Sequence, residues 1–214
     1  MYVQQTIAPS DTDDDGIAQS QTPAGAGNLT LNGALVSGGV ATFGAQQYIT
    51  ITCGGNDAGR TFTIVGTGTT GQTLTITQAG ANVGATTSTV GMKTVTRVSV
   101  DAATAGTIKV GIVGNGRQYP IAVDLNQNPT TISVTVDVTG TINYSVQQTY
   151  NNLSSGTPDT WTWFNCPDSA VVSKAADAIG SITSPPTAIA ILINSVTAPG
   201  QAVFRVIQAT NTLG

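Results

Sequence analysis

Apolar and polar residues alternate along most of this chain in short runs with a period of two. Between Asn28 and Gly114 the alternating apolar positions are Ile49, Ile51 and Cys53, then Phe62 and Ile64, Leu74 and Ile76, Val98 and Val100, and Ile108, Val110 and Ile112. Threonine occupies most of the positions between them. Such alternation is typical of strands with one face in a core and one in solvent. Glycine-rich turns separate the runs by about 8–12 residues, the spacing of a sandwich or barrel.

A second alternating series follows the turn Gly114-Asn115-Gly116, which we interpret as a domain boundary. Its clearest part is Ile132–Val138, which the turn at Thr139-Gly140 is expected to pair with 142–146 as a hairpin. The spacing of apolar residues between Ser169 and Gly180 predicts one short helix. Two further strands are expected, one at Ile189, Ile191 and Ile193 and the other from Val203 to Ile207. Few long crossovers are available, so the sheets should be antiparallel.

Residues 1–27 contain no periodic apolar segment and carry four aspartates, at positions 11, 13, 14 and 15. We interpret them as an extended N-terminal arm. The predicted fold is therefore all-β: an arm over 1–27, one antiparallel β-sandwich domain over 28–115, and a second over 116–214. Periodicity does not reveal strand order, so an Ig-like sandwich and a jelly roll remain open for these domains.

The composition supports the all-β prediction. Only 8% of the residues are charged, against about 25% in an ordinary soluble domain, and every acidic residue is Asp. Thr, Val, Ile, Ser, Asn and 25 Gly replace the usual helix-forming surface residues. The net charge is −4 and the seven Lys and Arg are scattered, so nucleic acid is not an expected partner. No signal peptide or long apolar segment is recognisable, so we expect neither secretion nor a membrane partner.

Acid–base chemistry has few candidate residues, because the sequence contains neither His nor Glu. A paired-aspartate glycosidase would have to use two of Asp124, Asp137, Asp159 and Asp168. We interpret each of these as a turn or strand-end residue bonded to its own backbone. Cys53 and Cys166 fall in different predicted domains and are expected to be buried free thiols. The chain is therefore predicted not to be an enzyme, with no catalytic, cofactor-binding or metal-binding residues and no cofactor.

Two motifs resemble known ligand loops. In GTGTTG, the residues Gly66, Gly68 and Gly71 have dinucleotide-binding spacing, but strands flank them, so a glycine-rich hairpin loop is the better interpretation. In DTDDDG, the aspartates at 11, 13 and 15 and Gly16 match the first half of a calcium loop. The position that needs a bidentate Glu is Thr22, so an EF-hand is excluded. A weaker oxygen-ligand site remains a hypothesis beside the alternative of a solvated acidic arm.

Trp161, Trp163 and Phe164 form an aromatic group in the second predicted domain. Tryptophans of this kind line carbohydrate or protein contacts, or fill a core that is poor in other aromatic residues. Alternation places the two tryptophans on one face and Phe164 on the other. We favour the core role and keep the binding role as an alternative.

Long stretches of the sequence resemble structural proteins of tailed bacteriophages. The resemblance lies in GGNDAGRTFTIVGTGTTGQTLTITQAGANVGATTSTVGMKTVTRVSV, GTIKVGIVG, YPIAVDLNQNPTTISVTVDVTGTINYSVQQTYNNL, TWFN and VFRVIQAT, and it covers most of the chain from about Ile17 onward. It implies a virion protein made in the host cytoplasm, most often a capsid decoration or cement protein. A head–tail junction, collar or tail component is an alternative, as is a host-surface glycan-binding module.

The expected partners are the major capsid protein or other virion proteins, and further copies of the chain, for instance in a trimer. A Thr, Asn and Gly surface with little charge binds through strand edges and shape complementarity. We expect residues 1–27 to lie along the capsid or a neighbouring subunit as an added strand. Many identical copies on a shell would then turn modest contacts into high avidity.

Overall fold

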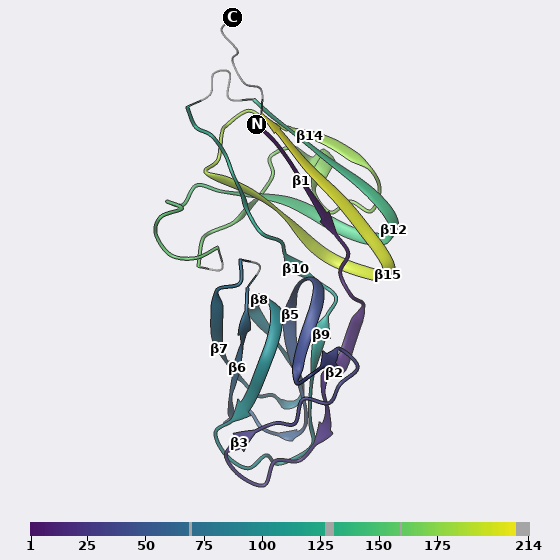
Figure 1. Ribbon diagram of the computed structural model, residues 1–214, viewed down its shortest axis with the longest axis vertical. Coiled ribbons are helices and arrows are strands. Elements are labelled where there is room, and N and C mark those ends of the chain that lie inside the picture. Colours follow the sequence, from purple (N-terminus) through teal and green to yellow (C-terminus); the bar gives the residue numbers. More distant parts are fainter. Residues whose placement is uncertain (69, 127–130, 159, 209–214) are drawn as a thin grey trace, which may run out of the picture. The chain divides into compact units, whose positions relative to one another are not determined.

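The computed structural model describes residues 1–68, 70–126, 131–158 and 160–208 (Figure 1). It is all-β with antiparallel sheets, as predicted, and the chain divides into two compact units. Unit 1 comprises Met1–Pro9 and Arg117–Gly214, and unit 2 comprises Ser10–Gly116. The division after Gly116 coincides with the predicted boundary to within one residue. Unit 2 is thus inserted in the sequence between the first strand of unit 1 and the rest of that unit.

The seven-stranded sheet is built on two very long strands, β12 and β15, which pair along almost their whole length. Its order is β1-β15-β12-β13, with β10 and β11 beside β15 and β14 beside β12. The strands are β1 (Tyr2–Ile7), β10 (Gly116–Arg117), β11 (Ile121–Ala122), β12 (Ile132–Thr149), β13 (Phe164–Asn165), β14 (Ala178–Ile182) and β15 (Ala188–Gln208). A single 3-10 turn, η1 (Ser169–Val171), completes the regular structure described in this unit.

The β12–β15 ribbon changes direction at its middle, where the register shifts between Thr139 and Thr141. Gly140 has a φ of 75°, which glycine adopts without the penalty that other residues carry, and a Cβ there would lie 2.2 Å from the Pro199 carbonyl oxygen. Both halves of the ribbon contribute fully buried side chains, among them Val134 and Phe204 from one half and Tyr144 from the other. Figure 1 shows the two halves running in different directions, as in a sandwich made from one folded sheet.

Two local predictions in this unit are wrong. The segments on either side of Thr139-Gly140 do not pair as a hairpin, because Gly140 bends one continuous strand whose partner is β15. Nor is the stretch Ser169–Gly180 a helix: only Ser169–Val171 forms a 3-10 turn, and Ala178–Ile182 forms β14 on β12. The β14 pairing leaves Ile179 72% exposed, although the helical pattern counted it as a core residue.

Unit 2 contains the eight-stranded sheet, in the order β2-β9-β5-β8-β6-β7, with β3 beside β8 and β4 beside β5. Its strands are β2 (Thr12–Gln21), β3 (Gly27–Asn28), β4 (Val36–Ser37), β5 (Val40–Asn56), β6 (Thr61–Thr67), β7 (Thr73–Ala79), β8 (Asn82–Val100) and β9 (Ile108–Val113). The long strands β5 and β8 again connect two groups, because β9 pairs with the second half of β5 and β6 with the second half of β8.

The core of unit 2 includes many of the inward residues that the alternation predicted. Ile49, Ile51, Phe62 and Ile64 are all fully buried, and so are Val98 and, on β9, Ile108, Val110 and Ile112. The core continues beyond the predicted domain, since Ile17 and Ala18 of β2 are also fully buried in it. At about 25 cal/mol per Å² of apolar surface, these burials account for much of the stability of the unit.

The N-terminal arm predicted over 1–27 is not present as such. Tyr2–Ile7 is β1, an edge strand of unit 1 that pairs with β15 from Tyr2↔Ile207 to Ile7↔Ala202. Thr12–Gln21 is β2 of unit 2 and pairs with β9. Burial alternates along β1, but Gln5 occupies one of its inward positions, and the pairing of β2 with β9 is interrupted by register shifts. Neither segment therefore shows a periodic apolar pattern, and both are edge strands, where polar residues and bulges are tolerated.

Candidate interaction surfaces

Of the four aspartates considered for a glycosidase, the three that the structure describes are each held by a partner of their own. Asp137 forms an ion pair with Arg205. Asp168 caps the 3-10 turn, where its carboxylate accepts hydrogen bonds from the Ala170 and Ser181 amides, both at 2.9 Å. These bonds lower the pKa of the Asp168 carboxyl. Asp124 accepts a bond of 3.0 Å from the amide two residues later, and Asp159 lies outside the described residues. Asp124 and Asp168 therefore have the local backbone-bonding roles that their positions predicted, whereas the prediction is wrong for Asp137, which pairs with an arginine on a neighbouring strand.

The acidic stretch at the start of β2 gathers a different set of carboxylates from the predicted one. Oxygen atoms of Asp13, Asp14 and Asp15 lie within 4.8 Å of one another, whereas the calcium-loop pattern required residues 11, 13 and 15. Lys109 Nζ donates to Asp14 Oδ2 at 3.0 Å, and the bond raises the pKa of Lys109. The backbone amide of Asp15 donates to Asp13 Oδ1 at 3.2 Å. Part of this negative charge is thus already neutralised by the protein.

The described residues of the glycine-rich segment GTGTTG lie at the end of β6 and in the connection to β7, the hairpin loop that the sequence predicted. The Gly68 amide donates to the Gln72 carbonyl at 3.0 Å, and the Gly71 amide donates back to Gly68 at 3.1 Å. Gly71 has a φ of 80°, which explains a glycine at this position. Because strands lie on both sides, no helix N-terminus is present to bind a phosphate.

The described residues of the segment 150–165 carry the aromatic group and contact β12, beside which Phe164–Asn165 forms β13. Thr149 Oγ1 donates to the Thr162 carbonyl at 2.8 Å, and Gln147 Nε2 donates to Asn165 Oδ1 at 3.2 Å. The register places Ala188 and Ala190 opposite these two β12 residues, and both alanines are buried. Small side chains there leave room for the covering segment.

Each tryptophan is held within this covering segment. The indole N–H of Trp161 donates to the Ser155 carbonyl at 2.8 Å, and that of Trp163 donates to the Pro158 carbonyl at 2.9 Å. Arg117 stacks on Trp163, with 4.8 Å between the guanidinium carbon and the ring centre. Phe164 is 52% exposed and contacts Tyr150 on the other side, as the alternation predicted. Trp161 and Trp163 are only partly buried and are not part of the core, so the predicted core role is wrong for them.

A hollow of about 150 Å³ lies beside Trp161, lined also by Tyr119, Pro120 and Leu153. Tyr119 is 43% exposed there. The described contacts of the tryptophans are made to their own segment and to Arg117. They therefore favour a packing role over the glycan-binding alternative.

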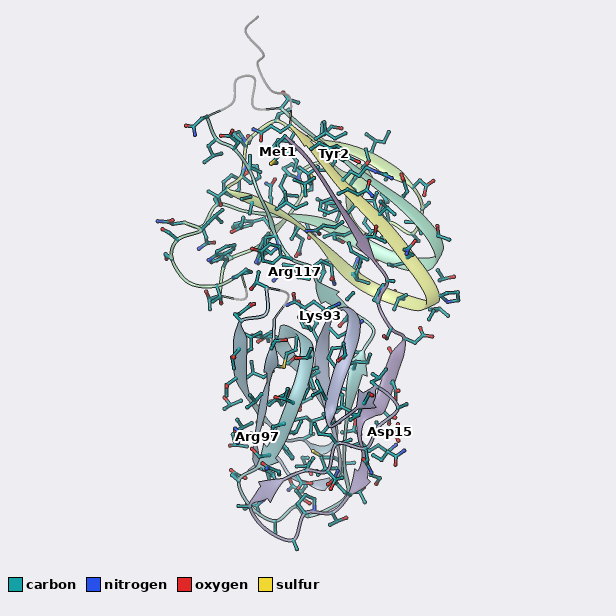
Figure 2. The ribbon with its side chains drawn as sticks, in the orientation of Figure 1. Met1, Tyr2, Asp15, Lys93, Arg97 and Arg117 are labelled. Atoms are coloured by element: carbon teal, nitrogen blue, oxygen red, sulfur yellow. The ribbon has the colours of Figure 1, made fainter. Side chains whose placement is uncertain are left out.

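A flat outer face of unit 1 is formed by β1, β15, β12 and β14, which lie side by side (Figure 1). The register brings Tyr2 opposite Ile207, and Arg205 lies in the next row with Gln4 beside it and Ile179 two strands away. Tyr2 is 61% exposed and Ile207 is 40% exposed; Figure 2 shows Tyr2 at the start of β1. Three large apolar side chains thus face solvent around one Arg–Asp ion pair.

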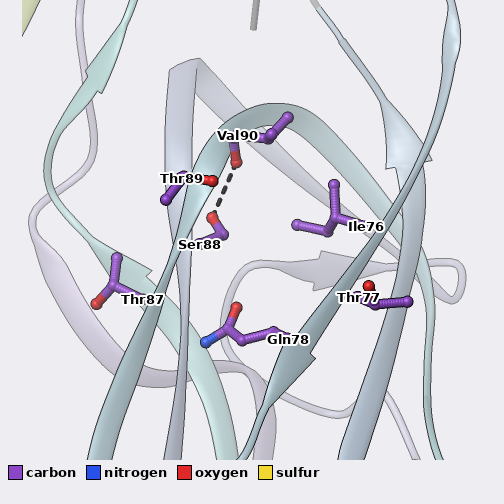
Figure 3. A pocket seen from close by; sticks show the side chains of 7 residues that line it. All are labelled: Ile76, Thr77, Gln78, Thr87, Ser88, Thr89 and Val90. Atoms are coloured by element: carbon purple, nitrogen blue, oxygen red, sulfur yellow. Dashed lines mark hydrogen bonds between the residues drawn. The ribbon is translucent and has the colours of Figure 1, made fainter. Parts of the chain in front are cut away.

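The last strand of the unit 2 sheet, β7, is paired with β6 alone among the strands that the structure describes. A hollow of about 340 Å³ lies between β7 and the 87–90 part of β8, lined by Ile76, Thr77, Gln78, Thr87, Ser88, Thr89 and Val90 (Figure 3). The Ser88 hydroxyl bridges two backbones, since it accepts from the Ile49 amide at 2.9 Å and donates to the Val90 carbonyl at 2.8 Å. Neither this edge nor the flat outer face of unit 1 was identified as a site from the sequence.

Both cysteines are free and buried, as predicted. Burial raises the pKa of the Cys53 thiol and of the Cys166 thiol. In the part of the chain that the structure describes, no helix is long and apolar enough to span a membrane.

No protein-family model and no curated protein matches this chain. A weak structural neighbour is the solved structure described as "Crystal structure of PBSX exported protein XepA". The similarity covers 97% of this chain and 86% of that chain, at 8% sequence identity and a TM-score of 0.25. A likeness at this level supports no argument about function.

Proposed function

We propose that this chain is a non-enzymatic structural protein of a tailed-bacteriophage particle, which binds the outside of the capsid and stabilises it. The observation that carries the proposal is the flat outer face of unit 1, where Tyr2, Ile179 and Ile207 are exposed on four adjacent strands. Large apolar side chains gathered on a flat face are typical of a protein contact. The resemblance of the sequence to phage structural proteins supplies the partner, the major capsid protein or another virion protein.

The chemistry of this face suits a contact made in many copies. Its charged pair, Arg205 and Asp137, is already joined, so covering it leaves no isolated charge without a partner. The other side chains named on this face, those of Tyr2, Gln4, Ile179 and Ile207, carry no charge. A ligand that binds only the assembled shell stabilises that shell by mass action, and repeated copies add avidity.

Electron cryomicroscopy of purified particles that contain this chain tests the position in the virion. Density repeated over the capsid shell, with the outer face of unit 1 against it, is the expected result. Density confined to the portal vertex or the tail would contradict the decoration role and favour a junction or tail component.

A substitution at Ile179 tests the contribution of this face to capsid binding separately from the rest of the molecule. Ile179→Asp places a charge in the contact without disturbing the core, because Ile179 is 72% exposed. Occupancy on particles should fall by at least about tenfold, since burying an unpaired charge costs more than 1.4 kcal/mol. Val83→Asp is the matched control, because Val83 is 65% exposed in unit 2. Equal occupancy of the two variants would refute the assignment of this face.

A further inference from the structure

In the part of the chain that the structure describes, the outer edge of β7 is open over most of its length; at its end the Ala79 carbonyl accepts a hydrogen bond of 2.9 Å from Thr86 Oγ1. Each of its residues from Thr73 to Ala79 pairs with β6, and the sheet order places no strand on its other side. The inward side chains Leu74 and Ile76 pack against the core of unit 2 but are only partly buried. A row of backbone amides and carbonyls therefore ends beside a core that is not fully covered.

This edge lacks the features by which proteins keep strand edges from pairing. Thr73–Ala79 contains no charge, proline or glycine, and no charged residue occurs anywhere from Thr61 to Met92. At the other end of the same sheet, β2 carries three aspartates and its pairing with β9 is irregular. Charges and bulges of that kind block edge-to-edge association, whereas a neutral strand rich in β-branched residues favours it.

The hollow next to β7 adds a second, independent observation. Gln78 Nε2 donates to Thr86 Oγ1 at 2.8 Å, but Gln78 Oε1 is buried and has no hydrogen-bond partner. Figure 3 shows the Gln78 side chain at the hollow, with Ile76 and Ser88 on its walls. A buried carbonyl oxygen without a donor is costly, so this side of β7 is not fully satisfied by the chain's own contacts.

We propose that β7 pairs antiparallel with β7 of a second copy of this chain, which joins the two unit 2 sheets into one. The segment is self-complementary about Ile76: that residue would face its own copy, Thr75 would face Thr77, and Leu74 would face Gln78. Neutral side chains meet neutral side chains, although the chain as a whole carries a net charge of −4. The two partly buried apolar rows then continue each other across the twofold axis.

This pairing does not rest on the proposed virion role, since it concerns the purified protein alone. It predicts a twofold dimer rather than the trimer expected from the sequence. The decoration role would stand if the purified protein were a monomer, and the dimer would stand if the protein had another role. The two proposals can therefore be refuted separately.

Sedimentation velocity over a range of protein concentrations tests the inference. The unmodified chain should show a reversible dimer. In the double variant Thr75→Lys, Thr77→Lys, lysines would face lysines across the pair, and like charges at such a distance cost several kcal/mol. The dimer dissociation constant should rise by at least about 100-fold. Both side chains are exposed, so the fold should be retained, as circular dichroism would verify.

Thr61→Lys is the control, because Thr61 is exposed on the same sheet but lies on β6, away from the open edge. It should leave the dimer intact. Hydrogen exchange on the unmodified chain should show protection of the β7 amides that increases with concentration. A monomer at every concentration, or a double-lysine variant that still dimerises, would overturn the proposal, as would concentration-dependent protection confined to other strands.

Discussion

Ile17→Ala tests whether the N-terminal region is an integral part of unit 2. Ile17 is fully buried in the core, and backbone bonds hold the strand there, with the Gly33 amide donating to the Ile17 carbonyl at 3.1 Å. The substitution removes three buried carbons, worth about 2.4 kcal/mol at roughly 0.8 kcal/mol each. A residual cavity raises the loss of unfolding free energy to about 3–4 kcal/mol. For a unit of about 100 residues, the melting temperature should fall by roughly 12–16 °C.

Differential scanning calorimetry would measure this loss. Because Trp161 and Trp163 both lie in unit 1, tryptophan fluorescence recorded in parallel follows that unit separately. Ser20→Ala is the control on the same strand, where the exposed side chain should contribute no more than about 0.5 kcal/mol. If the Ile17→Ala and Ser20→Ala variants have the same melting temperature, residues 12–21 are not part of the core and the extended-arm interpretation stands.

Three further measurements test local environments. Burial raises the pKa of Tyr144 to about 12, so the folded state favours the neutral phenol, whose hydroxyl donates to the Ala176 carbonyl. The stability that this preference contributes below pH 10 should be lost between pH 10 and 12. Urea unfolding of Tyr144→Phe should show a smaller loss of stability over the same pH range. The pKa of the Asp168 carboxyl is lowered from 3.8, so its contribution to folding stability is present above pH 3.8 and is lost as the pH falls through the pKa of the folded state. Asp168→Asn should therefore lose less stability in acid than the unmodified chain. An equal loss in acid would contradict the capping role. Cys53 and Cys166 should react with a thiol reagent only slowly in the native protein and rapidly in urea, because the thiolate is the reactive form; rapid reaction of native protein would refute their burial.

The parts of the fold that the sequence predicted are those set by local chemistry. The β6–β7 hairpin follows from two alternating segments and the glycine at 71, all within neighbouring residues. The bend at Gly140 uses the same residue type, but the strand that pairs across it lies about 60 residues further along the chain. In the sequence, a glycine in a hairpin turn cannot be told from a glycine that bends one continuous strand, because the difference lies in which strand pairs with the flanking residues. The pattern for the 169–180 helix failed similarly, because pairing of β14 with β12 outweighed a weak helical preference.

The candidate surfaces could be predicted less well than the strands. The flat outer face of unit 1 combines Tyr2, Ile179 and Ile207, which only the strand order brings together. The open edge had a usable signal, since the absence of charge from Thr61 to Met92 is visible in the sequence. Which strand of that stretch lies at the edge, however, depends on pairings made by distant residues.

The insertion of unit 2 after β1 also affects the order in which the protein is made. Met1 and Gln208 are joined at one end of the β1–β15 pairing, where the terminal amino group donates to the Gln208 carbonyl at 2.7 Å. At about 5–20 residues per second, roughly 10–40 s of translation separate these two residues. Every strand of unit 2 leaves the ribosome in that interval, while β1 has no partner. Unit 1 therefore closes last, and in a cell making many copies, a waiting β1 could be exchanged between neighbouring nascent chains.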